Sequence, residues 1–216
     1  MINVKCFPLG VLAANCYLVT NEEDRVSLLV DPGDYSETLD QQIEQFGSDR
    51  LQYILLTHGH FDHIGGAAAF KRKHPNAKIV ISTADAGYLQ NDRLNLSYHF
   101  DVSIEPFTAD LQVGEGDELP FGSHSVKVIS TPGHTSGGVC YIIDRTMFTG
   151  DTLISGTTGR TDFPTGSLRE MAHSIRRLAK LEGDYSVYCG HGGASTLQNE
   201  RENNYFMREC IYDDLS

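Results

Sequence analysis

The sequence has few basic residues and no extended basic run. It contains 17 Lys and Arg against 29 Asp and Glu, for a formal net charge of −12, and its longest run of basic residues is at positions 71–73. A surface that binds nucleic acid needs clustered cationic side chains to neutralise phosphates. We therefore expect no nucleic-acid partner.

Long apolar runs are also missing. No stretch approaches the ~18 to 20 uncharged residues that a membrane span requires, so we expect no membrane partner. Residues 5–14 resemble a short secretory hydrophobic region. However, Pro8 and Gly10 interrupt this region, and it continues directly into residues 16–19, which are typical of a strand. We therefore expect a strand here and a cytoplasmic protein.

The sequence also lacks closely spaced cysteine pairs and flexible linkers. The five cysteines include no Cys-x-x-Cys pair and are odd in number, which disfavours a disulfide framework and a thiolate zinc site. We expect reduced thiols. The chain has no Ser/Gly/Pro-rich linker, no low-complexity segment and no repeat at the level of residues, so residues 1–216 are predicted to form a single domain.

The hydrophobic pattern predicts an α/β protein with similar layouts in its two halves. Strands are expected at residues 2–7, 15–20, 26–30, 53–56, 78–81, 118–121, 125–130, 139–143, 147–148 and 186–188. Helices are expected at residues 37–46, 64–73, 84–89 and 167–181, and a polar loop at 91–110. The first three strands should form an antiparallel meander. Two packed sheets with helices outside are the simplest architecture for this pattern.

The most informative stretch is Thr57-His58-Gly59-His60-Phe61-Asp62-His63, directly after an apolar strand and directly before a helix. His58 and His60 are two residues apart, so in an extended segment both imidazoles point to one side and can reach one metal ion. Asp62 has an alternative role as the N-cap of the helix. A capped helix does not, however, require three histidines within six residues.

Three further candidates lie at strand ends beside glycines. His134 follows Pro132-Gly133, Asp151 follows Gly150, and His191 lies between glycines in Cys189-Gly190-His191-Gly192. Glycine allows a sharp turn and a close approach, and loops at strand ends commonly build sites. The remaining histidines have no ligand-like neighbours in the sequence and are expected to be solvated or core side chains: His74, His99, His124 and His173.

Together these motifs resemble the metallo-β-lactamase fold superfamily. The pattern comprises His-x-His-x-Asp-His at 58–63, Thr-Pro-Gly-His-Thr at 131–135, Gly-Asp-Thr at 150–152, Gly-His-Gly at 190–192 and the early Asp31-Pro32-Gly33. The resemblance implies a four-layer αββα sandwich with two mixed sheets. It also implies two divalent metal ions, zinc first, with iron or manganese as alternatives. The first ion would be bound by His58, His60 and His134, and the second by Asp62, His63 and His191, with Asp151 bridging both.

The resemblance assigns further roles as well. Asp62 and Asp151 would be the catalytic carboxylates, and Asp31 would orient a ligand without binding metal itself. Asp31 has the alternative reading of a simple strand-to-turn residue before Pro32. Cys189 stands where relatives commonly have Pro, and we expect a buried residue at a strand end rather than a ligand.

Residues 159–164, Gly-Arg-Thr-Asp-Phe-Pro, narrow the resemblance to glyoxalase II-like hydrolases and persulfide dioxygenases. The first alternative implies hydrolysis of a small acyl thioester such as S-lactoylglutathione by a metal-bridging hydroxide, with Arg160 contacting the thiol carrier or being a plain surface residue. Only about 25 residues follow His191, whereas longer glyoxalase II enzymes carry an extra helical region that helps to bind glutathione.

The second alternative is a mononuclear iron oxidoreductase that would not keep His191, so a complete ligand set favours the hydrolase. It also argues against a catalytically silent binding protein, and the expected cytoplasmic location argues against β-lactam hydrolysis as the main role.

Overall fold

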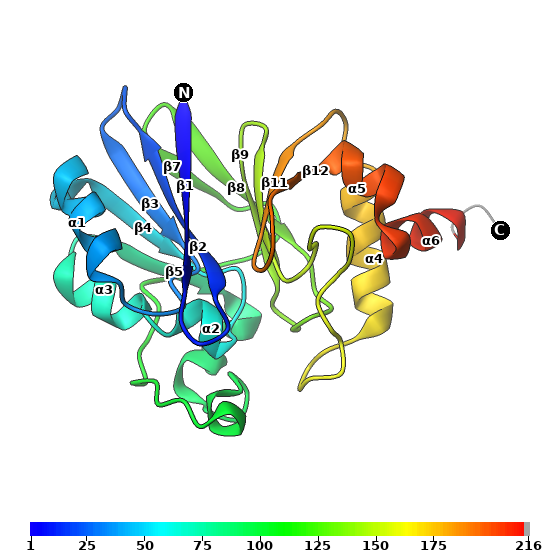
Figure 1. Ribbon diagram of the computed structural model, residues 1–216, viewed down its shortest axis with the longest axis horizontal. Coiled ribbons are helices and arrows are strands. Elements are labelled where there is room, and N and C mark those ends of the chain that lie inside the picture. Colours follow the sequence, from blue (N-terminus) through cyan, green and yellow to red (C-terminus); the bar gives the residue numbers. More distant parts are fainter. Residues whose placement is uncertain (214–216) are drawn as a thin grey trace.

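Two six-stranded sheets pack face to face in the computed structural model, which describes residues 1–213 apart from the side chains of residues 48, 212 and 213 (Figure 1). The first sheet has the order β1-β2-β3-β4-β5-β6, with strands at Ile2–Leu9, Ala14–Asn21, Val26–Val30, Leu51–Leu55, Lys78–Ser82 and Leu111–Val113. The second has the order β12-β11-β10-β9-β8-β7, and in chain order from β7 its strands are Glu118–Phe121, His124–Ser130, Val139–Ile143, Thr146–Gly150, Ser186–Cys189 and Ser195–Thr196.

Both sheets are mixed. Strands β1, β2 and β3 form the expected antiparallel meander, whereas β3, β4, β5 and β6 run parallel. In the second sheet, β10 pairs with β11 in parallel and the other neighbours are antiparallel. The predicted architecture of two mixed sheets is thus confirmed.

Alternating side chains along the strands build three apolar layers. Leu28 and Val30 of β3 point into the core between the two sheets, while Leu29 packs beneath the helices on the outer face. Tyr141 of β9 points inward and Cys140 points outward in the same way. Because strands alternate with a period of two, a strand covered on both faces is apolar throughout, which explains the apolar runs in the sequence.

Helices cover both outer faces. Helices α1 (Glu37–Phe46) and α3 (Ala67–Lys73) lie on the first sheet, and α4 (Leu168–Ala179), α5 (Leu197–Asn203) and α6 (Tyr205–Asp213) lie on the second, which completes four layers (Figure 1). The hydroxyl of Ser36 caps α1 by accepting from the Leu39 amide, and Ser167 caps α4 by accepting from the Glu170 amide.

The expected helix at 64–73 is instead two helices, α2 (Phe61–Ile64) and α3. The helix is interrupted at Gly65 and Gly66 because the turn formed by these glycines packs directly against the segment after β3. A Cβ on Gly66 would lie 2.4 Å from the backbone of Asp34. The expected helix at 84–89 is the 3₁₀ helix η2 (Thr83–Gln90), and the loop at 91–110 contains another 3₁₀ helix, η3 (Ser97–Phe100).

Several short elements were not predicted: η1 (Ser48–Arg50), β6, β12, α5 and α6. Strands of two or three residues carry no measurable periodicity, and their position depends on the strand beside them. A signal for α5 did exist, since the Thr196 hydroxyl accepts from the Asn199 amide as an N-cap.

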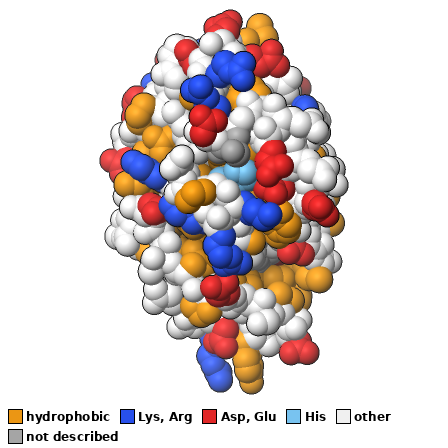
Figure 2. Space-filling view, turned by 90° about the vertical axis from the view of Figure 1, so that its left-hand side faces the viewer, with side chains coloured by type: hydrophobic (Ala, Val, Ile, Leu, Met, Phe, Trp, Pro, Cys, Tyr) orange, Lys and Arg blue, Asp and Glu red, His pale blue; other side chains and the backbone are white. Residues whose placement is uncertain are grey.

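The face shown in Figure 2 carries charged side chains of both signs. On the side where α1 and α3 lie, Lys and Arg side chains are interspersed with Asp and Glu side chains (Figure 2). Within residues 1–213, no helix has both the length and the apolar character needed to cross a membrane.

Strand direction brings the candidate motifs together. Parallel strands β3 and β4 end at one edge of the first sheet, and parallel strands β10 and β11 end at one edge of the second. Strand β8 runs in the same direction as β10, because both are antiparallel to β9. The segments that follow these five strands, including α2 after β4, hold all the predicted site residues, and ligand sites of sheet proteins commonly lie at such carboxyl ends.

Candidate metal centre

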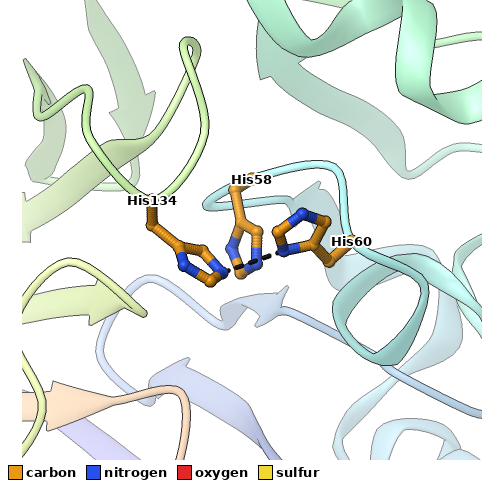
Figure 3. Close-up of side chains that lie close together, drawn as sticks. All are labelled: His58, His60 and His134. Atoms are coloured by element: carbon orange, nitrogen blue, oxygen red, sulfur yellow. Dashed lines mark hydrogen bonds between the residues drawn. The ribbon is translucent and has the colours of Figure 1, made fainter. Parts of the chain in front are cut away.

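Three buried histidines form the first ligand group. His58 and His60 come from the loop after β4 and His134 from the loop after β8, and their ligand-type atoms lie within 4.8 Å of one another. The three rings converge from the two loops (Figure 3), with His60 Nδ1 at 2.9 Å from His134 Nε2. Two nitrogen lone pairs at this distance repel one another, so a proton or a cation must lie between them.

A second group joins α2 to the loop after β11. His191 Nε2 lies 3.2 Å and His63 Nε2 lies 3.6 Å from the same oxygen, Asp62 Oδ2. The alternative role of Asp62 as an N-cap is wrong, because α2 begins at Phe61 with His60 in the cap position and no side-chain cap bond. The Asp62 carboxylate points to the two histidines instead.

Asp151 lies between the two groups. Its Oδ1 is 3.5 Å from His63 Nε2, and its Oδ2 is 3.5 Å from His134 Nε2 and 3.7 Å from His191 Nε2. One carboxylate therefore faces ligands of both groups, which is the placement expected of a bridging residue. A Cβ on Gly190 would lie 2.2 Å from Asp151 Oδ1, so the glycine before His191 permits this approach.

Asp31 fixes the orientation of two histidines. It has a positive φ of 51°, and its carboxylate accepts from the Thr57 amide at 2.7 Å, the Thr57 hydroxyl at 2.6 Å and His63 Nδ1 at 3.0 Å. Since Thr57 donates its only hydroxyl proton to Asp31, its oxygen accepts from His58 Nδ1 at 3.1 Å. Asp31 is thus more than a strand-to-turn residue: it leaves Nε2 of both histidines directed away from these partners.

His134 is oriented in the same way by the backbone. Its Nδ1 donates to the carbonyl of Arg160 at 2.7 Å, which leaves Nε2 as the unprotonated nitrogen that faces His60 and Asp151.

The residues present fit bound metal ions. His58 Nε2, His63 Nε2 and Asp151 Oδ1 are buried and have no hydrogen-bond partner among the described residues. A buried polar atom without a partner costs free energy, which a coordinated cation would remove. Imidazole and carboxylate donors suit zinc, iron and manganese.

The charges of the site are consistent with this fit. Burial and the neighbouring His134 lower the pKa of His60 to about 3, so its ring is neutral, as a ligand must be. Burial alone would lower the pKa of His63, but the carboxylates of Asp62, Asp31 and Asp151 outweigh it and raise the pKa to about 10. The protonated His63 ring offsets part of this negative charge, and a bound metal ion would supply positive charge in its place.

Arg160 lies at the margin of the site. Its Nε and Nη2 each donate to Asp162 at 2.7 Å, and its guanidinium carbon lies 4.1 Å from the centroid of the Phe163 ring. The side chain is exposed and already paired, so its predicted contact with substrate stays a prediction.

Cys189 is a buried strand-end residue, as expected. Its thiol lies 3.0 Å from the carbonyl of His191 and 3.2 Å from that of Gly193 and can donate its one proton to either, while the side chains of Asn15 and Tyr17 donate to the Cys189 carbonyl. The remaining histidines lie outside the ligand groups found among the described residues. For example, His74 is buried against Asp40 at 2.7 Å and His124 pairs with Asp144 at 2.8 Å.

Asp85 was missed by the sequence analysis. This fully buried residue of η2 accepts from the Gly59 amide at 3.0 Å and from the Thr135 hydroxyl at 2.7 Å, both through Oδ2. Gly59 lies between two ligands of the first group and Thr135 follows the third. Asp85 therefore ties together the two loops that supply the first ligand group.

We expect Asp85→Ala to weaken metal binding at the first group by about 10- to 100-fold, because the two loops lose their common anchor. Metal affinity measured by chelator competition tests this. Asp40→Ala is the matched control, since Asp40 is also a buried carboxylate but pairs with His74 and Tyr35 away from the centre. An equal loss of affinity in both variants would show a general loss of stability rather than positioning.

Comparison with known proteins places the chain in a family. Residues 9–191 match the model of the metallo-beta-lactamase superfamily. The chain belongs to the metallo-β-lactamase superfamily. The chain contains groups of His and Asp side chains that could hold a metal ion, and its superfamily membership makes it a metallo-hydrolase.

Several proteins are similar over nearly the whole length. The hydroxyacylglutathione hydrolase GloC of Haemophilus influenzae is 33% identical over 95% of this chain and 98% of its own. The BLEG-1 B3 metallo-beta-lactamase has a TM-score of 0.85 at 30% identity, with 96% of this chain and 99% of that chain covered. TTHA1623, solved in a di-iron-bound form, has a TM-score of 0.82 at 30% identity, with 94% and 100% covered.

Proposed function

We propose that this superfamily member hydrolyses small acyl thioesters, with S-lactoylglutathione as the first candidate. The observation that carries the proposal is the Asp151 carboxylate, which lies within 3.7 Å of ligand atoms from both groups. The similarity to GloC supports a thioester substrate. We further propose a cytoplasmic protein with neither nucleic acid nor membrane as a partner.

Two divalent metal ions belong to this proposal. His58, His60 and His134 would hold one, Asp62, His63 and His191 the other, and Asp151 would contact both. Zinc is the first choice from the donor set, and the di-iron form of TTHA1623 supports iron as an alternative, with manganese as a third. When bound, such ions ionise water near neutral pH and polarise a carbonyl oxygen.

The side chains of the centre position the reactants, and none of them needs to protonate the leaving group. Hydrolysis joins the oxygen of water to the acyl carbon and breaks the C–S bond, whose electron pair leaves on sulfur. The products are a carboxylic acid and a thiol. A thiol has a pKa of about 8.5, so sulfur leaves as thiolate without a general acid. No serine or cysteine nucleophile is needed, and Asp62 and Asp151 act by holding the charge and geometry of the centre.

Thiol release tests this function. We expect the metal-loaded protein to hydrolyse S-lactoylglutathione with a KM at or above the upper end of the ordinary range of ~1 μM to 1 mM, because no described residue after His191 lines the cavity over the centre. The panel includes other acyl thioesters and a β-lactam, since BLEG-1 is a B3 metallo-beta-lactamase.

The persulfide dioxygenase alternative needs a separate measurement. Oxygen consumption with glutathione persulfide, without thiol release from any thioester, would replace the hydrolase by that alternative. We favour the hydrolase because His191 and Asp62, which only a second metal ion would use, lie 3.2 Å apart, and His191 Nε2 also lies 3.7 Å from Asp151 Oδ2.

A further inference from the structure

A cavity of about 280 Å³ lies over the predicted metal ligands. Five predicted ligands line it, namely His60, Asp62, His134, Asp151 and His191. Apart from these ligands, its walls are mostly carbon: Leu12, Phe61, Leu96, Phe100, Ile154 and Phe163.

Two of these apolar side chains are left exposed to water. Leu12, at the tip of the β1–β2 hairpin, is 41% exposed, and Phe100, at the end of η3, is 45% exposed. The Phe100 ring packs on Phe61 with 4.9 Å between centroids, so it is held in place rather than free. Large apolar side chains exposed around a concave site are typical of a surface that a ligand covers.

Outside the predicted metal centre, the described lining of the cavity holds almost no free positive charge for an anionic carrier. Arg160 is the only Lys or Arg among its described lining residues, and both carboxylate oxygens of Asp162 already accept from its guanidinium. Glutathione carries two carboxylates and one ammonium group, a net charge of −1, and its carboxylates are bound most strongly by charge-assisted hydrogen bonds from Lys or Arg.

We propose that this cavity selects thioesters whose acyl group is apolar and whose thiol carrier is uncharged. The inference rests on the proposed thioesterase function and narrows its substrate class. S-lactoylglutathione, whose acyl group is polar and whose carrier is anionic, would then be hydrolysed with the high KM expected above and would not be the preferred substrate. An alkyl or aryl acyl group would displace water from the walls formed by Leu12, Phe61 and Phe100 while its carbonyl reaches the centre. An anionic carrier gains no comparable contact.

Thioesters that differ in one part at a time provide the test. S-acetyl and S-hexanoyl esters are compared on N-acetylcysteamine, which is uncharged, and on glutathione. Each buried methylene contributes up to about fourfold, so over four methylenes we expect the hexanoyl ester to exceed the acetyl ester in kcat/KM by at least about tenfold. For a given acyl group, we expect the uncharged carrier to be preferred.

Matched variants locate the selectivity. Phe100→Ala and Leu12→Ala should lower the hexanoyl/acetyl ratio of kcat/KM by about threefold or more, since each removes apolar wall. Tyr98→Ala and Val11→Ala are the controls, because these side chains are 58% and 74% exposed on the same two segments but do not line the cavity. Asp162→Asn should raise kcat/KM for glutathione esters relative to N-acetylcysteamine esters, because it releases Arg160.

The outcomes separate this inference from the proposed function. Hydrolysis of the whole panel with no preference for hexanoyl, or with a preference for glutathione, overturns the inference and leaves the thioesterase function standing. Equal loss of selectivity in Phe100→Ala and Tyr98→Ala also overturns it. Failure to hydrolyse any thioester with the metal centre filled overturns the proposed function itself.

Discussion

We expect Asp151→Ala to lower kcat by at least about 10³-fold and to reduce metal retention at the same time, because this carboxylate is the contact common to both ligand groups. Its removal would leave two cations without their shared anion and without a fixed separation. Steady-state thiol release, measured beside the metal content of the purified variant, tests both parts of the expectation.

Arg160→Ala and Asp151→Asn serve as controls for this result. Arg160→Ala keeps the backbone carbonyl that orients His134, so it should mainly raise KM. Asp151→Asn keeps the shape of the side chain in the tight space beside Gly190 and removes the charge, so a similar loss in both Asp151 variants assigns the effect to charge. Equal and mild effects of Asp151→Ala and Arg160→Ala would contradict the assignment.

The ligand residues were predictable because each is local to a motif. His58, His60, Asp62 and His63 share one seven-residue segment, and Asp151 adjoins a glycine at a strand end. The structure brings the predicted ligands together, while their binding roles stay predictions. The helix at Glu37–Phe46 was equally predictable, since its apolar spacing lies within the helix and its serine cap, Ser36, directly precedes it.

What the sequence could not show depends on contacts between distant segments. Asp85 lies 26 residues from Gly59 and 50 from Thr135, in a 3₁₀ helix with no recognisable motif. The break between α2 and α3 likewise depends on how closely the chain passes the backbone of Asp34. The apolar walls of the cavity come from a hairpin tip, a 3₁₀ helix and a later loop, and no linear pattern indicates that these meet.

We expect the purified protein to hold about two divalent metal ions per chain, because seven ligand-type residues exceed what one tetrahedral ion can use. Removal of the metal by a chelator should abolish thioester hydrolysis, and addition of zinc, iron or manganese should restore it. Elemental analysis of protein expressed with ample metal gives the stoichiometry, and the activity regained with each metal shows which ion supports the reaction.

Single substitutions distinguish two sites from one. His191→Ala should reduce the metal stoichiometry to about one ion per chain and strongly reduce hydrolysis. The second group would then retain only Asp62 and His63 of its three specific ligands. His173→Ala is the control, since His173 is exposed on α4 and belongs to none of the ligand groups found among the described residues, and this variant should keep both ions. A wild-type stoichiometry near one, with His63 and His191 replaceable at no cost to activity, would refute the two-metal centre and favour the mononuclear dioxygenase.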